Sequence, residues 1–219
     1  MKLKEVTAKI LRIIRQNFTW IIALLMLIIC FIIMEDLFDN HIYIFDDYVY
    51  KYVSMVISPK MTTFLEFITN LDSVAAVIAV CVAFLIFAKK KIYGKLMTLN
   101  LVIITTLNII IKNIFKRPRP TAHRIISETG YSFPSGHSMV SMAFYGLIIY
   151  IVYRYVDNKY LKVTLITLLS LLIFLIGISR IYLGVHYASD VAGAFCISVA
   201  YLILFTHILS KNKILVRDK

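Results

Sequence analysis

Three short polar clusters interrupt the long apolar runs of this sequence, at residues 112–120, 134–137 and 179–190. Together they contain the residue types that the transfer of a phosphoryl group needs. Such a reaction needs cations and N–H donors fixed on the non-bridging phosphate oxygens, a nucleophile in line with the leaving group, and an acid that protonates the departing oxygen. The three clusters therefore predict one phosphate-handling active site.

Candidates for binding phosphate occur in all three clusters. Lys112, Arg119 and Arg180 lie at or near the ends of apolar segments, and arginine presents a planar fork of donors that matches phosphate oxygens. Ser135 and Gly136 supply a hydroxyl and backbone N–H groups at the predicted start of a helix, where anions bind favourably. Glycine at this position lets an oxyanion approach the backbone without meeting a side chain.

Two histidines and an aspartate are the candidates for the chemical steps. His186 and Asp190 stand four residues apart, so on a helix they share a face. The carboxylate would then hold the imidazole in one tautomer and stabilise positive charge on it, which predicts His186 as the nucleophile. His137 would protonate the departing oxygen and later activate water against a phosphohistidine intermediate. This scheme uses no metal and no cofactor, and we expect neither.

These clusters resemble the signature of the type 2 phosphatidic acid phosphatase family, which shares its active site with bacterial acid phosphatases and vanadium haloperoxidases. The family is marked by the blocks K-x6-R-P, P-S-G-H and S-R-x5-H-x3-D. Each block occurs here at full spacing, as Lys112 to Arg119-Pro120, as Pro134 to His137, and as Ser179-Arg180 to His186 and Asp190. The resemblance implies His186 as nucleophile, Asp190 as its orienting partner, His137 as acid and base, and a phosphate cradle of Lys112, Arg119, Ser135, Gly136 and Arg180.

The first cluster contains two Arg-Pro pairs, and only one fits the family's spacing. Counting back from Arg117 puts Ile110 at the lysine position, so Arg119 is the match. Lys116 and Arg117 are then additional cations, and together with Arg124 they are expected either to be solvated or to meet the substrate headgroup.

The composition of the chain indicates that lipid is its main solvent. Of its 219 residues, 60% are hydrophobic and 16% are charged, whereas soluble domains contain roughly 45–50% apolar residues. Six segments are uncharged over about the ~17–25 residues of a spanning helix or slightly fewer: 16–34, 73–88, 96–111, 138–153, 163–179 and 191–209. We therefore expect an all-α membrane bundle of six transmembrane helices that forms a single domain over residues 1–219.

The distribution of cations predicts how the bundle is oriented. Of the 24 Lys and Arg residues, 16 fall at the two termini and in the segments 89–95 and 154–162, which share one side of the predicted bundle. By the positive-inside rule both termini are cytoplasmic, and the three polar clusters are extracytoplasmic. The excess of positive charge is thus explained by topology, so we expect a multi-pass protein of the cell membrane that does not bind nucleic acid.

The segment 35–72 follows the first predicted span and carries two helical patterns separated by Ser58-Pro59. We expect two short amphipathic helices in the membrane interface, which either flank a lipid entrance or merely cap the bundle. Cys30, Cys81 and Cys196 each lie in a predicted span and are expected to be small packing residues.

The function predicted from the sequence is the hydrolysis of a lipid phosphate at the outer membrane face. By resemblance to bacterial members, the substrate is phosphatidylglycerol phosphate, a polyprenyl pyrophosphate or phosphatidic acid. A non-catalytic lipid-phosphate transporter or binding protein is the main alternative, although such a protein is expected to lose the nucleophile or its partner. A vanadate-dependent haloperoxidase is less favoured because of the membrane location. The sequence carries no signal of oligomeric state.

Overall fold

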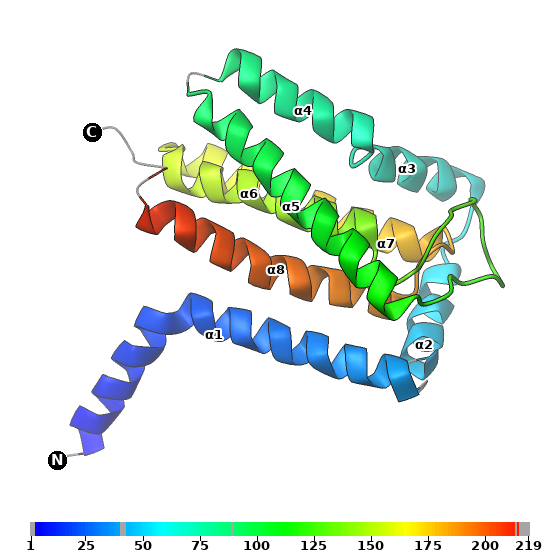
Figure 1. Cartoon of the computed structure of the whole chain (residues 1–219), viewed down its shortest axis with the longest axis horizontal. Coiled ribbons are helices and arrows are strands. Elements are labelled where there is room, and N and C mark those ends of the chain that lie inside the picture. The colour runs from blue at the N-terminus through cyan, green and yellow to red at the C-terminus, as the bar shows by residue number, and fades with distance from the viewer. Residues whose placement is uncertain (1–2, 40–42, 89, 213, 215–219) are drawn as a thin grey trace.

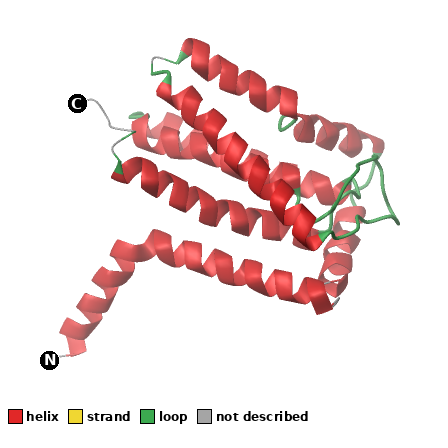
Figure 2. Cartoon of the chain, in the orientation of Figure 1, coloured by secondary structure: helices red, strands yellow, loops and turns green. Residues whose placement is uncertain are grey.

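The computed structural model describes residues 3–39, 43–88, 90–212 and 214, and within these ranges the chain is helical without strands. Eight helices follow one another along the described chain (Figures 1 and 2). Their bounds are α1 (Leu3–Asp39), α2 (Tyr43–Ser54), α3 (Pro59–Asn70), α4 (Val74–Phe87), α5 (Ile92–Phe115), α6 (Gly136–Tyr155), α7 (Lys159–Tyr182) and α8 (Ala188–Lys211). The all-helical prediction is therefore confirmed for the described residues.

Five of these helices are long and apolar enough to cross a membrane. They are α5, α6, α7 and α8 over their full lengths, and α1 over Gln16–Leu37. The sequence predicted a further span at 73–88, but α4 has only 14 residues, which is about 21 Å of helix against roughly 30 Å of hydrocarbon. Spanning length is reached only when α3 and α4, which meet at a bend of 43°, are taken together.

The two short helices predicted in the segment 35–72 are present as α2 and α3, and Ser58 is the N-cap of α3. Helix α1 continues to Asp39, α2 crosses the end of the bundle, and α3 runs on towards α4 beside the long helices (Figure 1). Leu65 of α3 is buried in a cluster with Leu183 and Val185, which belong to the segment after α7. Of the two predicted surface helices, only α2 lies across the bundle. Residues 40–42 lie outside the described residues.

Helix α6 is the centre of the bundle. It packs against α5, α7 and α8, while α1 packs on α8 and α4 packs on α5. Phe144 and Leu147 of α6 are fully buried in a cluster with Met97 of α5 and Ile176 of α7. Because α6 is enclosed by other helices, its first turn is held in a fixed position relative to α5, α7 and α8.

All the polar clusters lie at one end of the bundle. In Figure 1 the loop from 116 to 135 is at the end opposite to the start of α1 and the end of α8. Lys116 ends α5 in the left-handed conformation, with φ of 47°, and the prolines at 118 and 120 prevent the helix from continuing. The three cysteines are buried and free, as predicted.

Candidate active site

The eight predicted site residues come from helix ends and loops at this one end of the bundle. Lys112 is in the last turn of α5 and Arg180 in the last turn of α7. The others lie in or beside the loops that join these helices to α6 and α8, at Arg119, Ser135, Gly136, His137, His186 and Asp190. Three segments that are far apart in the sequence thus meet in one place, as their chemistry required.

His186 lies between Arg119 and Asp190. Its Nδ1 is 3.4 Å from Asp190 Oδ2, and its Nε2 is 3.1 Å from Arg119 Nη1. Since a guanidinium can only donate, Nε2 accepts this hydrogen bond, and the ring proton is on Nδ1, facing the carboxylate. Burial lowers the pKa of His186 to about 4, although Asp190 acts in the opposite direction. The resting imidazole is therefore neutral, with the lone pair of Nε2 on the side of the phosphate-binding cations.

His186 reaches this position from a turn, and not from a helix as the sequence predicted. The turn contains Gly184 at φ +69°, where a Cβ atom would lie 2.2 Å from the His123 carbonyl oxygen. Only glycine fits such a position without displacing the neighbouring backbone. Helix α8 begins at Ala188, and Asp190 in its first turn accepts a hydrogen bond of 2.8 Å from the Tyr187 N–H. The predicted pairing of His186 with Asp190 is thus present, but His186 lies in the turn before α8 and only Asp190 lies in the helix.

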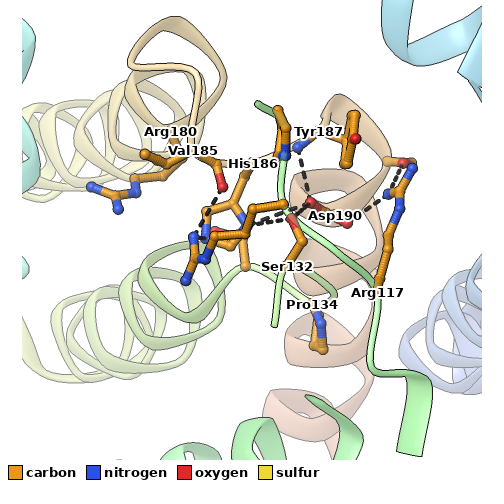
Figure 3. A network of polar contacts seen from close by, with 12 residues as sticks. Arg117, Ser132, Pro134, Arg180, Val185, His186, Tyr187 and Asp190 are labelled. Carbon is orange, nitrogen blue, oxygen red and sulfur yellow. Dashed lines mark hydrogen bonds and ion pairs between the residues drawn. The ribbon is translucent and has the colours of Figure 1, made fainter. Parts of the chain in front are cut away.

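Asp190 is fully buried and holds three further partners besides His186 (Figure 3). Its Oδ2 accepts hydrogen bonds from Tyr187 N–H and from the hydroxyl of Ser132, while its Oδ1 is 2.6 Å from Arg117 Nη1. The two carboxylate oxygens therefore contact different partners: Oδ2 faces His186, and Oδ1 faces Arg117. Such hydrogen bonding on every side keeps a buried carboxylate from rotating.

The prediction that Arg117 is a solvated cation or a headgroup contact is wrong. Its guanidinium is buried between two carboxylates, with Nη1 2.6 Å from Asp190 and Nη2 2.7 Å from Asp46 of α2. It also lies over the ring of Tyr187, 4.0 Å from the centroid. Burial acts to lower the pKa of Arg117, but Asp190 and Asp46 outweigh burial and the pKa is raised. The other two additional cations, Lys116 and Arg124, are exposed as expected.

The predicted phosphate cradle is held mainly by backbone oxygens. Lys112 Nζ donates to the Tyr131 carbonyl, and Arg119 donates to the carbonyls of Thr129, Gly130 and Val185 at 2.9–3.1 Å. Carbonyl oxygens orient these cations without neutralising them. The two positive charges therefore remain available to an anion beside His186.

Arg180 differs from the other cradle residues because a carboxylate is already bound to it. Its Nη2 is 2.6 Å from Glu128 Oε1, and its Nη1 donates to Thr69 of α3 at 3.1 Å. Burial raises the pKa of Glu128, but the hydrogen bond and charge of Arg180 outweigh burial and the pKa is lowered. Arg180 is almost fully buried, whereas the Glu128 side chain is 30% exposed. The ionised Glu128 thus contacts the guanidinium from the more exposed side.

Ser135 and Gly136 begin α6 as predicted. Ser135 is the N-cap, and its hydroxyl oxygen accepts from Ser138 Oγ at 2.9 Å, which leaves its own O–H as a donor. A Cβ atom on Gly136 would approach Asn108 Oδ1 to 3.3 Å, so the backbone here packs closely against α5. The first-turn N–H groups of α6 complete the donor set of the site.

A pocket of about 470 Å³ leads from the start of α6 to the outside of the bundle between α4 and α5. His137 and Gly136 line it at the site. Its wall is otherwise mainly aliphatic, with Val77, Leu101 and Val140 among the lining residues. The pocket therefore connects the histidine that was predicted to protonate the leaving group with the outside of the bundle between α4 and α5.

Several residues in contact with the site were missed from the sequence. Ser132 is two residues before Pro134, in the loop that contains the second cluster. This proximity was a weak signal that Ser132 belongs to the site, where it contacts Asp190. The sequence contains no signal for Asp46 or Glu128. Neither periodicity nor spacing relates a carboxylate in a polar segment to an arginine far away in the sequence.

Comparison with known proteins shows the family of this chain. The PAP2 superfamily matches residues 93–214. Phosphatidylglycerophosphatase B of Bacillus subtilis (strain 168) is 32% identical over 165 residues, which cover 73% of this chain and 80% of that protein.

Two solved structures are also similar. The crystal structure of the first transmembrane PAP2 type phosphatidylglycerolphosphate phosphatase from Bacillus subtilis has a TM-score of 0.78 and 25% identity, covering 90% of this chain and 98% of that one. The crystal structure of Aquifex aeolicus LpxE has a TM-score of 0.56 and 25% identity, covering 71% of this chain and 92% of that one. By sequence match and by fold, this chain belongs to the PAP2 superfamily.

Proposed function

We propose that this protein is a lipid phosphatase that hydrolyses a phosphomonoester or pyrophosphate through a phosphohistidine, without a metal. The observation that carries the proposal is the arrangement around His186. Its Nδ1 faces the Asp190 carboxylate and its Nε2 faces Arg119, at 3.4 and 3.1 Å. A phosphate that takes the place of this hydrogen bond between Arg119 and Nε2 would therefore meet the Nε2 lone pair of an oriented and neutral imidazole.

In the first step, the lone pair of His186 Nε2 attacks phosphorus and the bond from phosphorus to the leaving oxygen breaks. A bound phosphate anion stabilises the protonated form of His137. His137 then gives its proton to that oxygen, so that the leaving group departs as a neutral alcohol, or as a protonated phosphate when the substrate is a pyrophosphate. The positive charge that forms on His186 is stabilised by Asp190 through the Nδ1 proton. Lys112, Arg119, Arg180 and the N–H groups of α6 stabilise the charge on the phosphate oxygens.

In the second step, water hydrolyses the phosphohistidine. Neutral His137 accepts a proton from water as the water oxygen attacks phosphorus. The bond from phosphorus to nitrogen breaks, and its electron pair returns to His186 Nε2. Inorganic phosphate leaves, and both histidines regain their starting protonation states.

The aliphatic pocket supports a lipid as the leaving group. His137 must contact the leaving oxygen, and His137 lines the pocket that leads between α4 and α5. An apolar tail attached to the leaving oxygen would therefore lie in a surface of matching polarity. The names of the relatives favour phosphatidylglycerol phosphate, and polyprenyl pyrophosphate and phosphatidic acid are the other candidates.

The proposal predicts chelator-resistant phosphatase activity of the purified protein in detergent. Phosphate release should be measured from phosphatidylglycerol phosphate, phosphatidic acid and a polyprenyl pyrophosphate, with and without excess chelator. We expect unchanged release with chelator and inhibition by vanadate, which mimics the five-coordinate transition state. The His186→Ala protein, purified in parallel, corrects for contaminating phosphatases.

The possible outcomes of this assay separate the alternatives. Activity that chelator abolishes would contradict the metal-free mechanism. Binding of lipid phosphate without release from any of the three substrates would favour the transporter or binding protein. Vanadate-dependent oxidation of halide would favour the haloperoxidase.

We also propose that the site faces the extracytoplasmic side, because most cations of the sequence cluster at the opposite end of the bundle. Parts of these cation-rich segments, including Lys89 and residues 215–219, lie outside the described residues.

Labelling of intact cells with a membrane-impermeant maleimide tests the orientation. Thr121→Cys, in the exposed site loop, should react, and Tyr160→Cys, 85% exposed at the other end, should react only after permeabilisation. Background should be low because the native cysteines are buried, and the reverse pattern would place the site in the cytoplasm.

A further inference from the structure

Helix α2 is connected to the active site through a buried carboxylate. Asp46 is 3% exposed, and its two oxygens accept hydrogen bonds of 2.8 Å from the N–H and the hydroxyl of Ser189 in the first turn of α8. Its Oδ2 is also 2.7 Å from Arg117 Nη2. Asp46 therefore joins α2, the loop after α5 and the start of α8.

Arg117 stands between two buried acids. Its Nη2 is 2.7 Å from Asp46 Oδ2, and its Nη1 is 2.6 Å from Asp190 Oδ1 (Figure 3). Because the guanidinium is planar, fixing one nitrogen on Asp46 fixes the direction of the other towards Asp190. Ser189 Oγ accepts from the same Nη1 at 2.8 Å, so this orientation is supported on both sides.

The position of Arg117 determines what Asp190 presents to His186. Arg117 holds Oδ1, which leaves Oδ2 in the direction of the His186 Nδ1 proton. The single positive charge of Arg117 also faces the charge of Asp190 from the side opposite to His186. If Arg117 were absent, Oδ1 would lose its ion-pair partner and the carboxylate would be held through Oδ2 alone, with His186 as the nearest partner for its charge.

We propose that Asp46 and Arg117 are positioning residues for the nucleophile, linked in the order Asp46, Arg117, Asp190, His186. The catalytic role of these two residues rests on the proposed function, but the main measurement that tests it, the titration of His186, does not require turnover. Asp46 lies outside residues 93–214, to which the family match extends, and Arg117 is not one of the residues of the family's three blocks. The site would then depend on α2, an element that contributes no residue to the chemistry.

The test is the titration of His186 in detergent-solubilised full-length protein with carbon-13-labelled histidine. The chain has five histidines, and the His186 signal is assigned by its loss in His186→Gln. In the wild type we expect a midpoint near a pKa of about 4. In Arg117→Met the midpoint should rise towards about 6.5, the ordinary pKa of histidine, because the uncompensated Asp190 carboxylate favours protonated His186.

Activity and matched variants complete the test. Arg117→Met should lower kcat by about 10- to 100-fold with a smaller change in KM, since the nucleophile is misoriented while the phosphate cradle is intact. Asp46→Asn should have an effect of the same kind but smaller, and this variant keeps the proposal testable if Arg117→Met does not fold. Lys116→Met and Asp47→Asn remove an exposed cation and an exposed carboxylate next to the two residues, and both should behave as wild type.

A double-mutant cycle shows whether Asp46 acts on Asp190 through Arg117. In the Arg117→Met background, Asp46→Asn should cause little further loss of kcat, because its effect passes through Arg117. Arg117→Lys should return the His186 midpoint towards the wild-type value but restore kcat only in part, because an ammonium carries the charge without the fork. Unchanged His186 titration in Arg117→Met and Asp46→Asn, with only a lower melting temperature, would overturn the proposal. If none of the proteins releases phosphate while the titration shifts as expected, the proposed function fails and the positioning inference stands.

Discussion

Replacing His186 with alanine is expected to lower phosphate release by roughly 10⁴-fold or more, because removal of a nucleophile abolishes the covalent route as a whole. Binding of the lipid phosphate should remain close to wild type, since Lys112, Arg119 and Arg180 are held by partners other than the imidazole, among them backbone carbonyls and Glu128. Arg119 loses one contact of 3.1 Å in this variant but keeps three to carbonyl oxygens.

Acid quenching with radiolabelled substrate checks this prediction directly. Wild-type protein should yield an acid-labile phosphoprotein, and His186→Ala should yield none. With an aryl phosphate, whose leaving group departs without a proton, His137→Ala should accumulate the adduct because His137 is needed to activate water in the second step. A phosphoprotein formed by His186→Ala would show that another residue is the nucleophile.

The residues of the candidate site were predictable because their signals are local or belong to short blocks of fixed spacing. Pro118 and Pro120 mark the end of α5, and Ser135 in front of an apolar run marks the start of α6. The blocks then specify which polar residues must meet. The structure brings these residues together, and the roles assigned to them remain predictions.

The supporting residues were not predictable, because their partners lie far away in the sequence. Arg117 contacts Asp46, 71 residues before it, and Asp190, 73 residues after it. A cation next to a proline in a polar loop has the same local pattern whether it is solvated or buried. Only the packing of α2 on α7 and α8 places two carboxylates on either side of Arg117.

Two features of the fold depend on packing in the same way. The bend between α3 and α4 occurs at Leu71 to Ser73, where Ser73 caps α4, and the sequence does not specify the 43° angle or the direction of α3. The pairing of His186 with Asp190 was inferred from helical periodicity, but a turn at Gly184 produces it. A spacing of four can thus bring two residues together even where the chain is not helical.

Arg180→Met is expected to lower kcat/KM by roughly 10³-fold, within the range observed when a cation or donor that stabilises phosphoryl or oxyanion charge is removed. Arg180 is 1% exposed at the end of α7, and Thr69 holds its Nη1. Its Nη2 binds the Glu128 carboxylate, whose oxygen occupies the position that a phosphate oxygen would take on this guanidinium. Arg180→Lys should recover part of the activity, because lysine keeps the charge but not the two parallel donors.

Glu128→Gln is the matched control, and it is expected to strengthen phosphate binding where Arg180→Met weakens it. In the resting protein Glu128 occupies Arg180, so a phosphate that binds there must displace an ionised carboxylate. Removal of the negative charge should tighten vanadate inhibition and lower KM by about 2- to 10-fold, a modest gain because the Glu128 side chain is 30% exposed and its ion pair is partly screened. Steady-state kinetics and vanadate inhibition of the three variants test this arrangement. Weaker vanadate binding in Glu128→Gln, or wild-type kcat/KM in a folded Arg180→Met protein, would show that Arg180 does not bind the phosphate and that Glu128 stabilises the loop instead.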